Sequence, residues 1–261
     1  KVEKEGNSLV IHSSGKLPKQ VKPTIDAGNS GIVYRFITGL CALIPSESTI
    51  TGDHSIRTKR PIMPLVKAIN SLGGAASPSN SMGHAPIRVS GPIQGSRVEI
   101  DGSDSQPVSA LIYAATQAPH PIEIAIDNMG EKPWIELSLS WLKQLNIPYD
   151  WTSETSIQLY GNASIKGFTY SVPGDFSSIS PFIALAVIQN RPLLIHGIDL
   201  EDSQGDKSLI PILEEMGARF KRGKNSLEVL SNDGLQGIAI DMDRCIDLLP
   251  TLAVIGSFAT G

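Results

Sequence analysis

The sequence has little cysteine and no cluster of potential metal ligands. Its two cysteines, Cys41 and Cys245, lie far apart in the 261 residues and form no Cys-x-x-Cys motif. A disulfide framework or a structural zinc site is therefore not expected, and a reducing compartment is the default. The five histidines are scattered without the spacing of metal ligands, so we assign them no chemistry and expect no metal site.

Positive charge and long apolar runs are also scarce. The formal net charge of −4 argues against a general nucleic-acid surface, although a local basic pocket is compatible with it. The apolar runs are interrupted by Ser, Thr, Gly or charged residues well short of the roughly 18 residues of a membrane span. No signal peptide is visible. A content of 41% hydrophobic and 18% charged residues is typical of a globular protein. The length of 261 residues fits one large or two modest domains.

A repeated unit is the clearest positive feature. A β-like run ends in a small polar or glycine-rich turn and opens into a helix of small apolar residues. The residues that close the four β-like runs are Asp26, Asp101, Pro173 and Asp241. Their spacings are 75 (26 to 101), 72 (101 to 173) and 68 (173 to 241) residues. Each turn directs the unpaired N–H groups of a helix N-terminus at a chosen point, so the repeats predict a protein that gathers anionic groups.

The rest of each repeat predicts a βαβαββ unit. The predicted first helices are Ile32–Leu43, Val108–Thr116, Ser180–Ile188 and Leu248–Ser257, all poor in charge and expected to be buried. The predicted second, amphipathic helices are Arg60–Gly73, Lys132–Leu145 and Lys207–Gly217. Pro61 and Pro133 are expected in first helical turns. The strands Ile87–Ser90 and Arg97–Ile100 are expected to close the first unit.

Two stretches of the first unit could bind an anion. The turn Asp26–Gly31 allows close approach of its backbone, and Arg35 adds a cation one turn later, although a Gly-rich turn alone is more often a tight connection. The loop Gly52–Ile62 brings three cations to the start of a helix, where the Arg60 guanidinium could grip a carboxylate or phosphate with two hydrogen bonds. For Lys59 a solvated position is the better interpretation.

The later turns offer further polar groups. Gly102–Gln106 provides hydroxyl, carboxylate and amide groups, with Ser103 or Asp104 expected as an ordinary helix cap. Asp247 lies beside apolar residues one turn into a predicted helix, which makes it a candidate general base. Asp241 and Asp243 are expected to cap that helix. Trp134 fits a pocket wall and a core position about equally well.

The sequence begins without Met in a charged segment and stops just past a predicted helix. We therefore expect it to be an internal part of a longer protein, truncated at both ends of the repeat array.

These motifs, in this order, resemble the 3-phosphoshikimate 1-carboxyvinyltransferase (5-enolpyruvylshikimate-3-phosphate synthase) family along essentially the whole chain. The matching stretches are Gly28–Gly31 with Arg35, Gly52–Pro61, Ser105–Gln106, Lys132–Trp134, Gly174–Ser178, Gln204–Asp206 and Ile246–Asp247. The resemblance implies a two-lobed inside-out α/β barrel built from βαβαββ units. It places residues 1–173 in an N-terminal lobe and residues 174–261 in a C-terminal lobe, both incomplete.

The same resemblance implies an activity. Members of the family move the enolpyruvyl group of phosphoenolpyruvate onto the 5-hydroxyl group of shikimate 3-phosphate and release phosphate, in the shikimate pathway that leads to chorismate and aromatic amino acids. No cofactor is required, and the family is the target of glyphosate. It further implies a monomer with small-molecule substrates and no nucleic-acid or membrane partner, in the bacterial cytoplasm or in a plastid if the source is a plant. Residues 1–261 alone are expected to be inactive.

Residue by residue, the resemblance assigns phosphoenolpyruvate contacts to Gly31, Arg60 and Gln106, with Arg35 adding positive potential. Shikimate 3-phosphate contacts fall to Ser105, Gln106 and Asp247, and Asp247 is also the catalytic base for the 5-hydroxyl group. The sequence has carboxylates, Asp104 and Glu131, where the family has Ser or another small residue. Ser103 is then a substitute ligand. The spacing from Gly31 to Arg60 is 29 residues, one longer than the resemblance leads us to expect. Arg57 is therefore a rival of Arg60 for the same contact.

Two other functions are compatible with these residues. The related UDP-N-acetylglucosamine enolpyruvyl transferases use a cysteine in the loop that here reads Gly52–Arg60, and no cysteine is present there. A non-catalytic domain that kept the fold and binds substrate is the alternative from another class.

Overall fold

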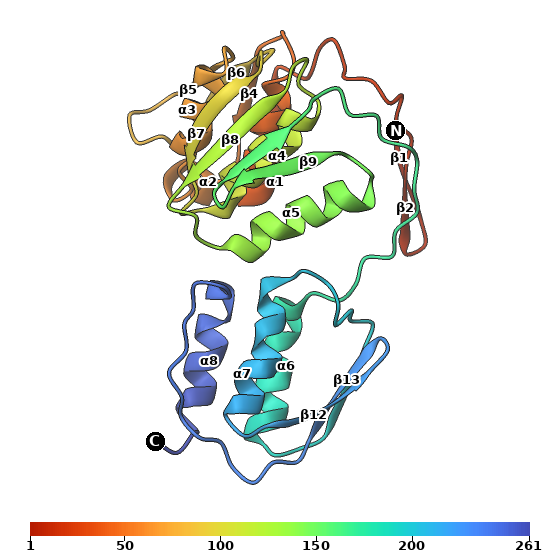
Figure 1. The fold of residues 1–261 in the computed structure, drawn as a ribbon, viewed down its shortest axis with the longest axis vertical. Coiled ribbons are helices and arrows are strands. Elements are labelled where there is room, and N and C mark those ends of the chain that lie inside the picture. The colour runs from red at the N-terminus through yellow and green to blue at the C-terminus, as the bar shows by residue number, and fades with distance from the viewer. The chain divides into compact units, whose positions relative to one another are not determined.

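The structure is a computed structural model that describes residues 1–261. It divides into two compact units, the first formed by Lys1–Met129 and Trp141–Phe168, the second by Gly130–Ser140 and Thr169–Gly261. This division into compact units does not test the predicted lobe boundary between residues 173 and 174, which stays a prediction. The α/β class predicted from the sequence is confirmed (Figure 1). None of the helices combines the length and the apolar character needed to cross a bilayer.

The first unit contains a complete βαβαββ repeat built around a four-stranded sheet. Strand β3 pairs in parallel with β4, and β4 and β5 both pair antiparallel with β6, which gives the order β3-β4-β6-β5. The elements are β3 (Thr24–Asp26), α1 (Gly31–Cys41), β4 (Ser48–Thr51), α2 (His54–Thr58), α3 (Met63–Ser71), β5 (Ala75–Pro78) and β6 (Ile87–Ser90). The hairpin of β1 (Val2–Glu5) and β2 (Ser8–Ile11) precedes them.

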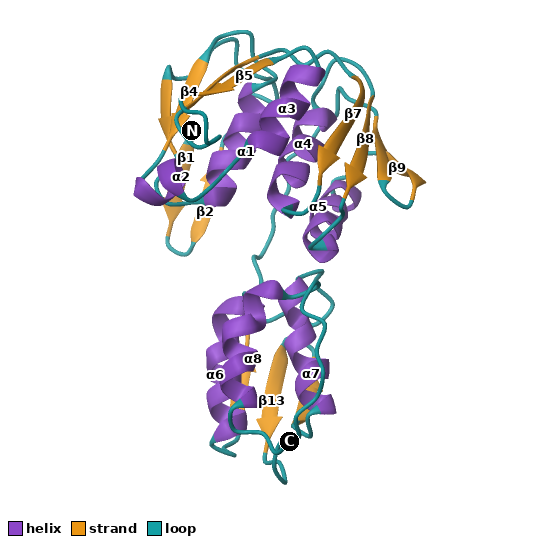
Figure 2. Ribbon diagram, turned by 90° about the vertical axis from the view of Figure 1, so that its left-hand side faces the viewer, coloured by secondary structure: helices purple, strands orange, loops and turns teal.

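A second βαβαββ repeat follows with the same topology. Its sheet has the order β7-β8-β10-β9, with β7 and β8 parallel and the remaining pairs antiparallel. The elements are β7 (Ser96–Asp101), α4 (Ser105–Thr116), β8 (Ile122–Asp127), α5 (Lys132–Gln144), β9 (Tyr149–Ser153) and β10 (Ser156–Leu159). Figure 2 shows α1, α3 and α4 between the two sheets, and these three helices contact one another.

The close contact of α1 with α4 depends on a small residue. A Cβ atom at Gly39 would lie 2.9 Å from the carbonyl oxygen of Ala110, so only glycine lets the two helices come this close. Ten of the twelve residues of α4 are buried, as predicted for a first helix poor in charge. This packing brings the N-terminal ends of α1 and α4, both expected to bind ligand, to the same part of the unit.

The second unit has a three-stranded antiparallel sheet of order β11-β13-β12, with helices beside it (Figure 2). Its elements are α6 (Phe176–Ile188), β11 (Leu193–His196), the 3₁₀ turn η1 (Gly205–Ser208), α7 (Leu209–Glu215), β12 (Arg219–Gly223), β13 (Ser226–Leu230), the 3₁₀ turn η2 (Ile246–Leu248) and α8 (Leu249–Gly256). One apolar core, which includes Phe176, Leu213 and Leu252, joins α6, α7, α8 and the sheet.

Three predictions about strands were wrong. Arg97–Ile100 does not close the first unit, because β7 pairs in parallel with β8 and so opens the second sheet; the closing strands of the first unit are β5 and β6. The β-like runs expected before Pro173 and Asp241, which are Thr169–Val172 and Ile238–Ile240, form no strand. A strand needs a neighbour for its backbone hydrogen bonds, and the second unit's sheet contains only β11, β12 and β13.

The region around the predicted basic loop also differs from expectation. Residues 54–58 form the short helix α2, capped by the Asp53 side chain, which accepts from the Ile56 N–H group at 3.0 Å. Helix α3 begins at Met63, not at Arg60, because Ile62 has a non-helical φ of −136°. The Ile62 N–H group donates to the Gly83 carbonyl at 3.1 Å. Pro61 therefore lies before the helix, and the first-turn proline is Pro64.

The prediction that every first helix is buried holds only for α4. Helix α1 exposes Ile32, α6 exposes Phe182 and α8 exposes Val254. Helix α4 packs against α1 and α3 and against strands β8 and β10.

Candidate functional site

The first turn is held by backbone hydrogen bonds to the end of β4. The Ala27 N–H group donates to the Thr51 carbonyl at 2.9 Å, and the Asp53 N–H group donates to the Gly28 carbonyl at 2.8 Å. Ser30 caps α1 by accepting from the Val33 N–H group at 3.2 Å. The start of α1 and the segment that leads to Arg60 are thereby fixed to each other.

Four residues that the sequence assigned to one ligand meet at Gly31. A Cβ atom at Gly31 would lie 2.9 Å from Arg35 Nη1, 3.4 Å from Gln106 Oε1 and 3.8 Å from Arg60 Cδ. These residues come from three separate stretches: helix α1, the segment before α3 and the start of α4. The first unit therefore brings together the residues predicted to contact phosphoenolpyruvate.

The structure places the two rival arginines in different surroundings. Arg60 is exposed and lies next to Gly31. Arg57 lies in α2, where its Nε donates to the Asp53 carbonyl at 3.3 Å. Arg60 is thus the cation at this point.

Helix α4 begins with the other predicted polar group. Asp104 is its N-cap and accepts from the Gln106 N–H group at 2.9 Å, as expected of one of the two capping candidates. Ser103 is exposed, and its N–H group donates to the Asp101 carboxylate at 3.0 Å, which lowers the pKa of that carboxyl group. Ser105 is buried, with 2% of its surface exposed.

Asp104 also forms an ion pair that the sequence did not predict. Its Oδ2 lies 2.7 Å from Nη2 of Arg35, whose side chain is 3% exposed. Arg35 Nη1 donates to Gln106 Oε1 at 3.0 Å, and Nη2 donates to the Pro61 carbonyl at 3.1 Å. The carboxylate that stands where the family has a small residue thus neutralises a buried cation.

The third turn, to which the sequence assigned no ligand, is satisfied internally. Asp175 caps α6 by accepting from the N–H groups of Ser177 and Ser178 at 3.2 and 3.1 Å. Gln204 Oε1 accepts from the Phe176 N–H group at 2.8 Å, while its Nε2 donates to the Gly174 carbonyl at 3.2 Å. The motifs Gly174–Ser178 and Gln204–Asp206 therefore meet and fix η1 to the start of α6.

Sequence reasoning missed the most unusual carboxylate. Asp206 is 0% exposed, and neither of its side-chain oxygens has a hydrogen-bond partner. Burial, with the negative charges of Asp247 and Asp175 nearby, raises its pKa to about 6. The only signal in the sequence was its place in the Gln204–Asp206 motif, because burial depends on tertiary packing.

Asp247, the predicted base, lies in η2 at the start of α8 and is exposed. The prediction that Asp241 and Asp243 cap this helix was wrong: the Asp243 N–H group donates to Asp241 Oδ1 at 3.0 Å, and η2 has no side-chain cap. Asp247 and Asp206 belong to the second unit, whereas Gly31, Arg35, Arg60 and Gln106 belong to the first.

The start of α5 and the two cysteines were also considered from the sequence. Glu131 precedes α5 with a φ of 49°, and Trp134, in the first turn of α5, is half-buried. Cys41 and Cys245 are both buried, which raises the pKa of each thiol. Neither thiol therefore has the exposure or the lowered pKa of a reactive cysteine.

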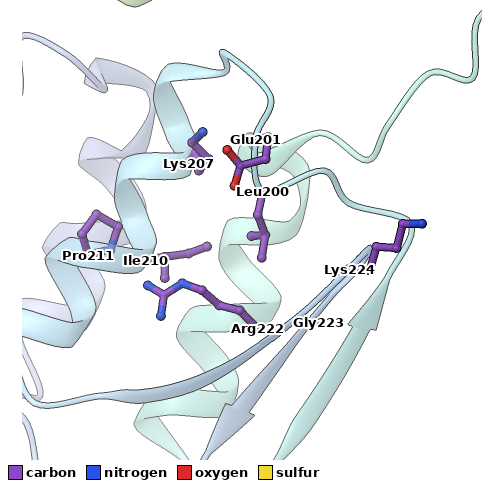
Figure 3. A pocket seen from close by; sticks show the side chains of 8 residues that line it. All are labelled: Leu200, Glu201, Lys207, Ile210, Pro211, Arg222, Gly223 and Lys224. Atoms are coloured by element: carbon purple, nitrogen blue, oxygen red, sulfur yellow. The ribbon is translucent and has the colours of Figure 1, made fainter.

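An open pocket in the second unit contains several cations but none of the predicted site residues (Figure 3). It is lined by residues from the Leu200–Glu201 loop, η1, the start of α7, the end of β12 and the turn that follows β12. Arg222 pairs with Glu214 at 2.7 Å, and Lys207 Nζ donates to the Asp202 carbonyl at 2.7 Å. The Glu214 carboxylate neutralises Arg222, whereas the uncharged Asp202 carbonyl leaves the charge of Lys207 in place.

Comparison with known proteins identifies the family of the chain. The sequence matches the family described as EPSP synthase (3-phosphoshikimate 1-carboxyvinyltransferase) over residues 1–261. The chain belongs to the EPSP synthase family. It is 39% identical to the 3-phosphoshikimate 1-carboxyvinyltransferase of Chlamydia caviae, covering 100% of this chain and 58% of the relative. It is 36% identical to the enzyme of that name from Acetivibrio thermocellus, covering 100% and 61%.

Solved structures of this family share the fold. EPSP synthase from Acinetobacter baumannii matches with a TM-score of 0.78, over 100% of this chain and 61% of that one, at 22% identity. The chain thus spans about 58–61% of the length of these EPSP synthase relatives.

Proposed function

We propose that the protein containing this chain transfers the enolpyruvyl group of phosphoenolpyruvate to the 5-hydroxyl group of shikimate 3-phosphate and releases phosphate. The observation that carries the proposal is the convergence at Gly31 of Arg35, Arg60 and Gln106, residues up to 75 positions apart (31 to 106) that were assigned to one ligand. Membership of the EPSP synthase family supports the same reaction.

The first unit supplies groups suited to two anionic substrates. At the start of α1, unpaired N–H groups and the positive end of the helix dipole favour a phosphate or carboxylate. Arg60 is an exposed guanidinium next to this end, able to bind either group with two hydrogen bonds. Ser103, Ser105 and Gln106, at the start of α4, are the proposed contacts to shikimate 3-phosphate.

The proposed reaction proceeds by addition and elimination. The methylene carbon of phosphoenolpyruvate takes up a proton, and the 5-hydroxyl oxygen bonds to C2 while its own proton passes to Asp247. Loss of a proton from the new methyl group and cleavage of the C2–O bond to phosphate then restore the double bond. A carboxylate at Asp247, exposed at the start of α8, fits this role of general base. The reaction requires no cofactor, and a cytoplasmic monomer remains the proposed form.

The related UDP-N-acetylglucosamine transfer is less favoured. Its loop cysteine is missing from Gly52–Arg60, and the two cysteines present are buried. A steady-state assay of phosphate release by the complete protein, with shikimate 3-phosphate or the nucleotide sugar as acceptor, separates the two reactions. Release only with shikimate 3-phosphate supports the proposal, and release only with the nucleotide sugar contradicts it. Calorimetric binding of shikimate 3-phosphate without turnover would indicate the non-catalytic alternative.

A further inference from the structure

Arg35 is bound on several sides by acceptors of the protein itself. Its Nη2 donates to Asp104 Oδ2 at 2.7 Å and to the Pro61 carbonyl at 3.1 Å, while Nη1 donates to Gln106 Oε1 at 3.0 Å and to the Gly31 carbonyl at 3.4 Å. The side chain is 3% exposed. A guanidinium so buried, with both terminal nitrogens donating, is poorly placed to bind a ligand directly.

Asp104 also neutralises the positive charge with which Arg35 could attract an anion. One carboxylate oxygen pairs with the guanidinium at 2.7 Å, and the other accepts from the Gln106 N–H group at 2.9 Å. The two side chains form a neutral pair, in which the Arg35 side chain is 3% exposed and the Asp104 side chain is 42% exposed. The cation that remains exposed beside Gly31 is Arg60.

The hydrogen bond to Gln106 has a consequence for that amide. A guanidinium can only donate hydrogen bonds, so it is the Gln106 carbonyl oxygen that must face Arg35. The amide nitrogen then points away from Arg35 as a donor, and none of the described hydrogen bonds uses it. Arg35 thus decides that Gln106 offers two N–H groups, which suit a phosphate, carboxylate or hydroxyl oxygen.

We propose that Arg35, paired with Asp104, is a positioning residue that fixes Gln106 as a hydrogen-bond donor to phosphoenolpyruvate and does not bind the substrate itself. The inference rests on the proposed function, because it takes the site at Gly31 to bind that substrate. It also assigns Arg35 a role different from the phosphate-attracting cation expected from the sequence.

A double-mutant cycle in the complete protein tests the inference, with Arg35→Lys, Gln106→Ala and the double variant. Lysine keeps the charge opposite Asp104, but it lacks the planar guanidinium that donates hydrogen bonds to Asp104, Pro61 and Gln106 at the same time. We expect each single variant to raise the KM for phosphoenolpyruvate by about tenfold. If Arg35 acts through Gln106, the KM for phosphoenolpyruvate of the double variant is also raised by only about tenfold. An increase of about a hundredfold, or no effect of Arg35→Lys, would overturn the proposal.

A second variant keeps the test decisive if Arg35→Lys fails to fold. Asp104→Asn retains one oxygen, which can accept from the Gln106 N–H group and cap α4, but it removes the charge and the second oxygen that pair with Arg35. The positioning role predicts a KM for phosphoenolpyruvate within about threefold of wild type, because Arg35 keeps its hydrogen bonds to the Pro61 carbonyl and to Gln106. A decrease of tenfold or more would show that Arg35, once freed, binds the substrate directly.

The same variants can be compared by calorimetric titration with phosphoenolpyruvate alone. The cycle of dissociation constants then tests the positioning role without turnover. Absence of phosphate release by the wild-type protein would contradict the proposed reaction and leave this binding cycle to decide the role of Arg35.

Discussion

Gln204 accepts a hydrogen bond from the backbone N–H group of Phe176 at 2.8 Å. The Gln204 amide nitrogen also donates to the Gly174 carbonyl at 3.2 Å. With these two hydrogen bonds, Gln204, which directly precedes η1, completes the first turn of α6. The N-terminus of α6 is therefore used for the architecture of the second unit. This explains why the third turn differs from the first, where Gly31 and Arg60 lie together at a helix start.

Replacement of Gln204 by Leu should destabilise the second unit by about 1–3 kcal/mol. The Phe176 N–H group would lose its acceptor, and Phe176 itself is buried, so the donor would have no replacement partner. Urea unfolding measures the change. Gln189→Leu, at the exposed C-terminal end of the same helix, is the matched control and should change stability by less than about 0.5 kcal/mol. Equal effects of the two variants would show that the Gln204 bonds contribute nothing specific.

Asp206→Asn should make the protein more stable at pH 8 but not at pH 4. The native-state pKa of about 6 lies above the ordinary value of 3.8, so the native state holds more protons than the unfolded state between these values. Stability attributable to Asp206 therefore falls as the pH rises through this window. Removing the charge should restore of order 1–3 kcal/mol at pH 8.

Urea unfolding at both pH values tests this expectation. Asp233→Asn is the control in the same unit, because the Asp233 side chain is 94% exposed. A loss of stability at pH 8 in Asp206→Asn would mean that the buried carboxylate has a stabilising partner in the complete protein.

Arg60→Ala should raise the KM for phosphoenolpyruvate in the complete protein by about 10- to 100-fold. This corresponds to the loss of one charge-assisted, two-pronged contact. Arg57→Ala is the matched control three residues earlier and should change KM by less than about threefold, because Arg57 Nε donates to the Asp53 carbonyl. The reverse order of effects in steady-state kinetics would assign the substrate contact to Arg57.

Asp247→Ala should lower kcat in the complete protein much more than it raises either KM. Loss of a general base typically lowers the rate about 10²–10⁴-fold, and a base acts in the transition state more than in the bound substrate complex. Asp243→Ala, which removes a nearby exposed carboxylate, should retain turnover close to wild type. Turnover near wild type in Asp247→Ala would exclude Asp247 as the base.

Much of the fold follows from local sequence patterns. The two βαβαββ units of the first half and the position of α4 agree with the periodicity of apolar residues. The short helix α2 also had a local signal, since Asp53 is a typical N-cap that accepts from Ile56. The prediction of two strands at Thr169–Val172 and Ile238–Ile240 was wrong. A strand forms only where a neighbouring strand pairs with it, and a local sequence pattern carries no information about that neighbour.

The candidate site was only partly predictable for the same physical reason. Gly31 and Gln106 could be named because each stands at a helix start, and Arg60 because it ends a basic loop directly before a proline. The pairing of Arg35 with Asp104 joins residues 69 positions apart (35 to 104), and only the packing of α1 against α4 creates it. Asp206 shows the limit most clearly, because its raised pKa arises from burial beside carboxylates of α6 and η2.

The most direct test of the proposed function is the mass spectrum of the product that the complete protein forms from phosphoenolpyruvate and shikimate 3-phosphate. The account predicts that shikimate 3-phosphate gains the mass of one enolpyruvyl group while an equal amount of phosphate is released. Unchanged shikimate 3-phosphate, in the presence of protein that is folded and binds both substrates, would contradict it.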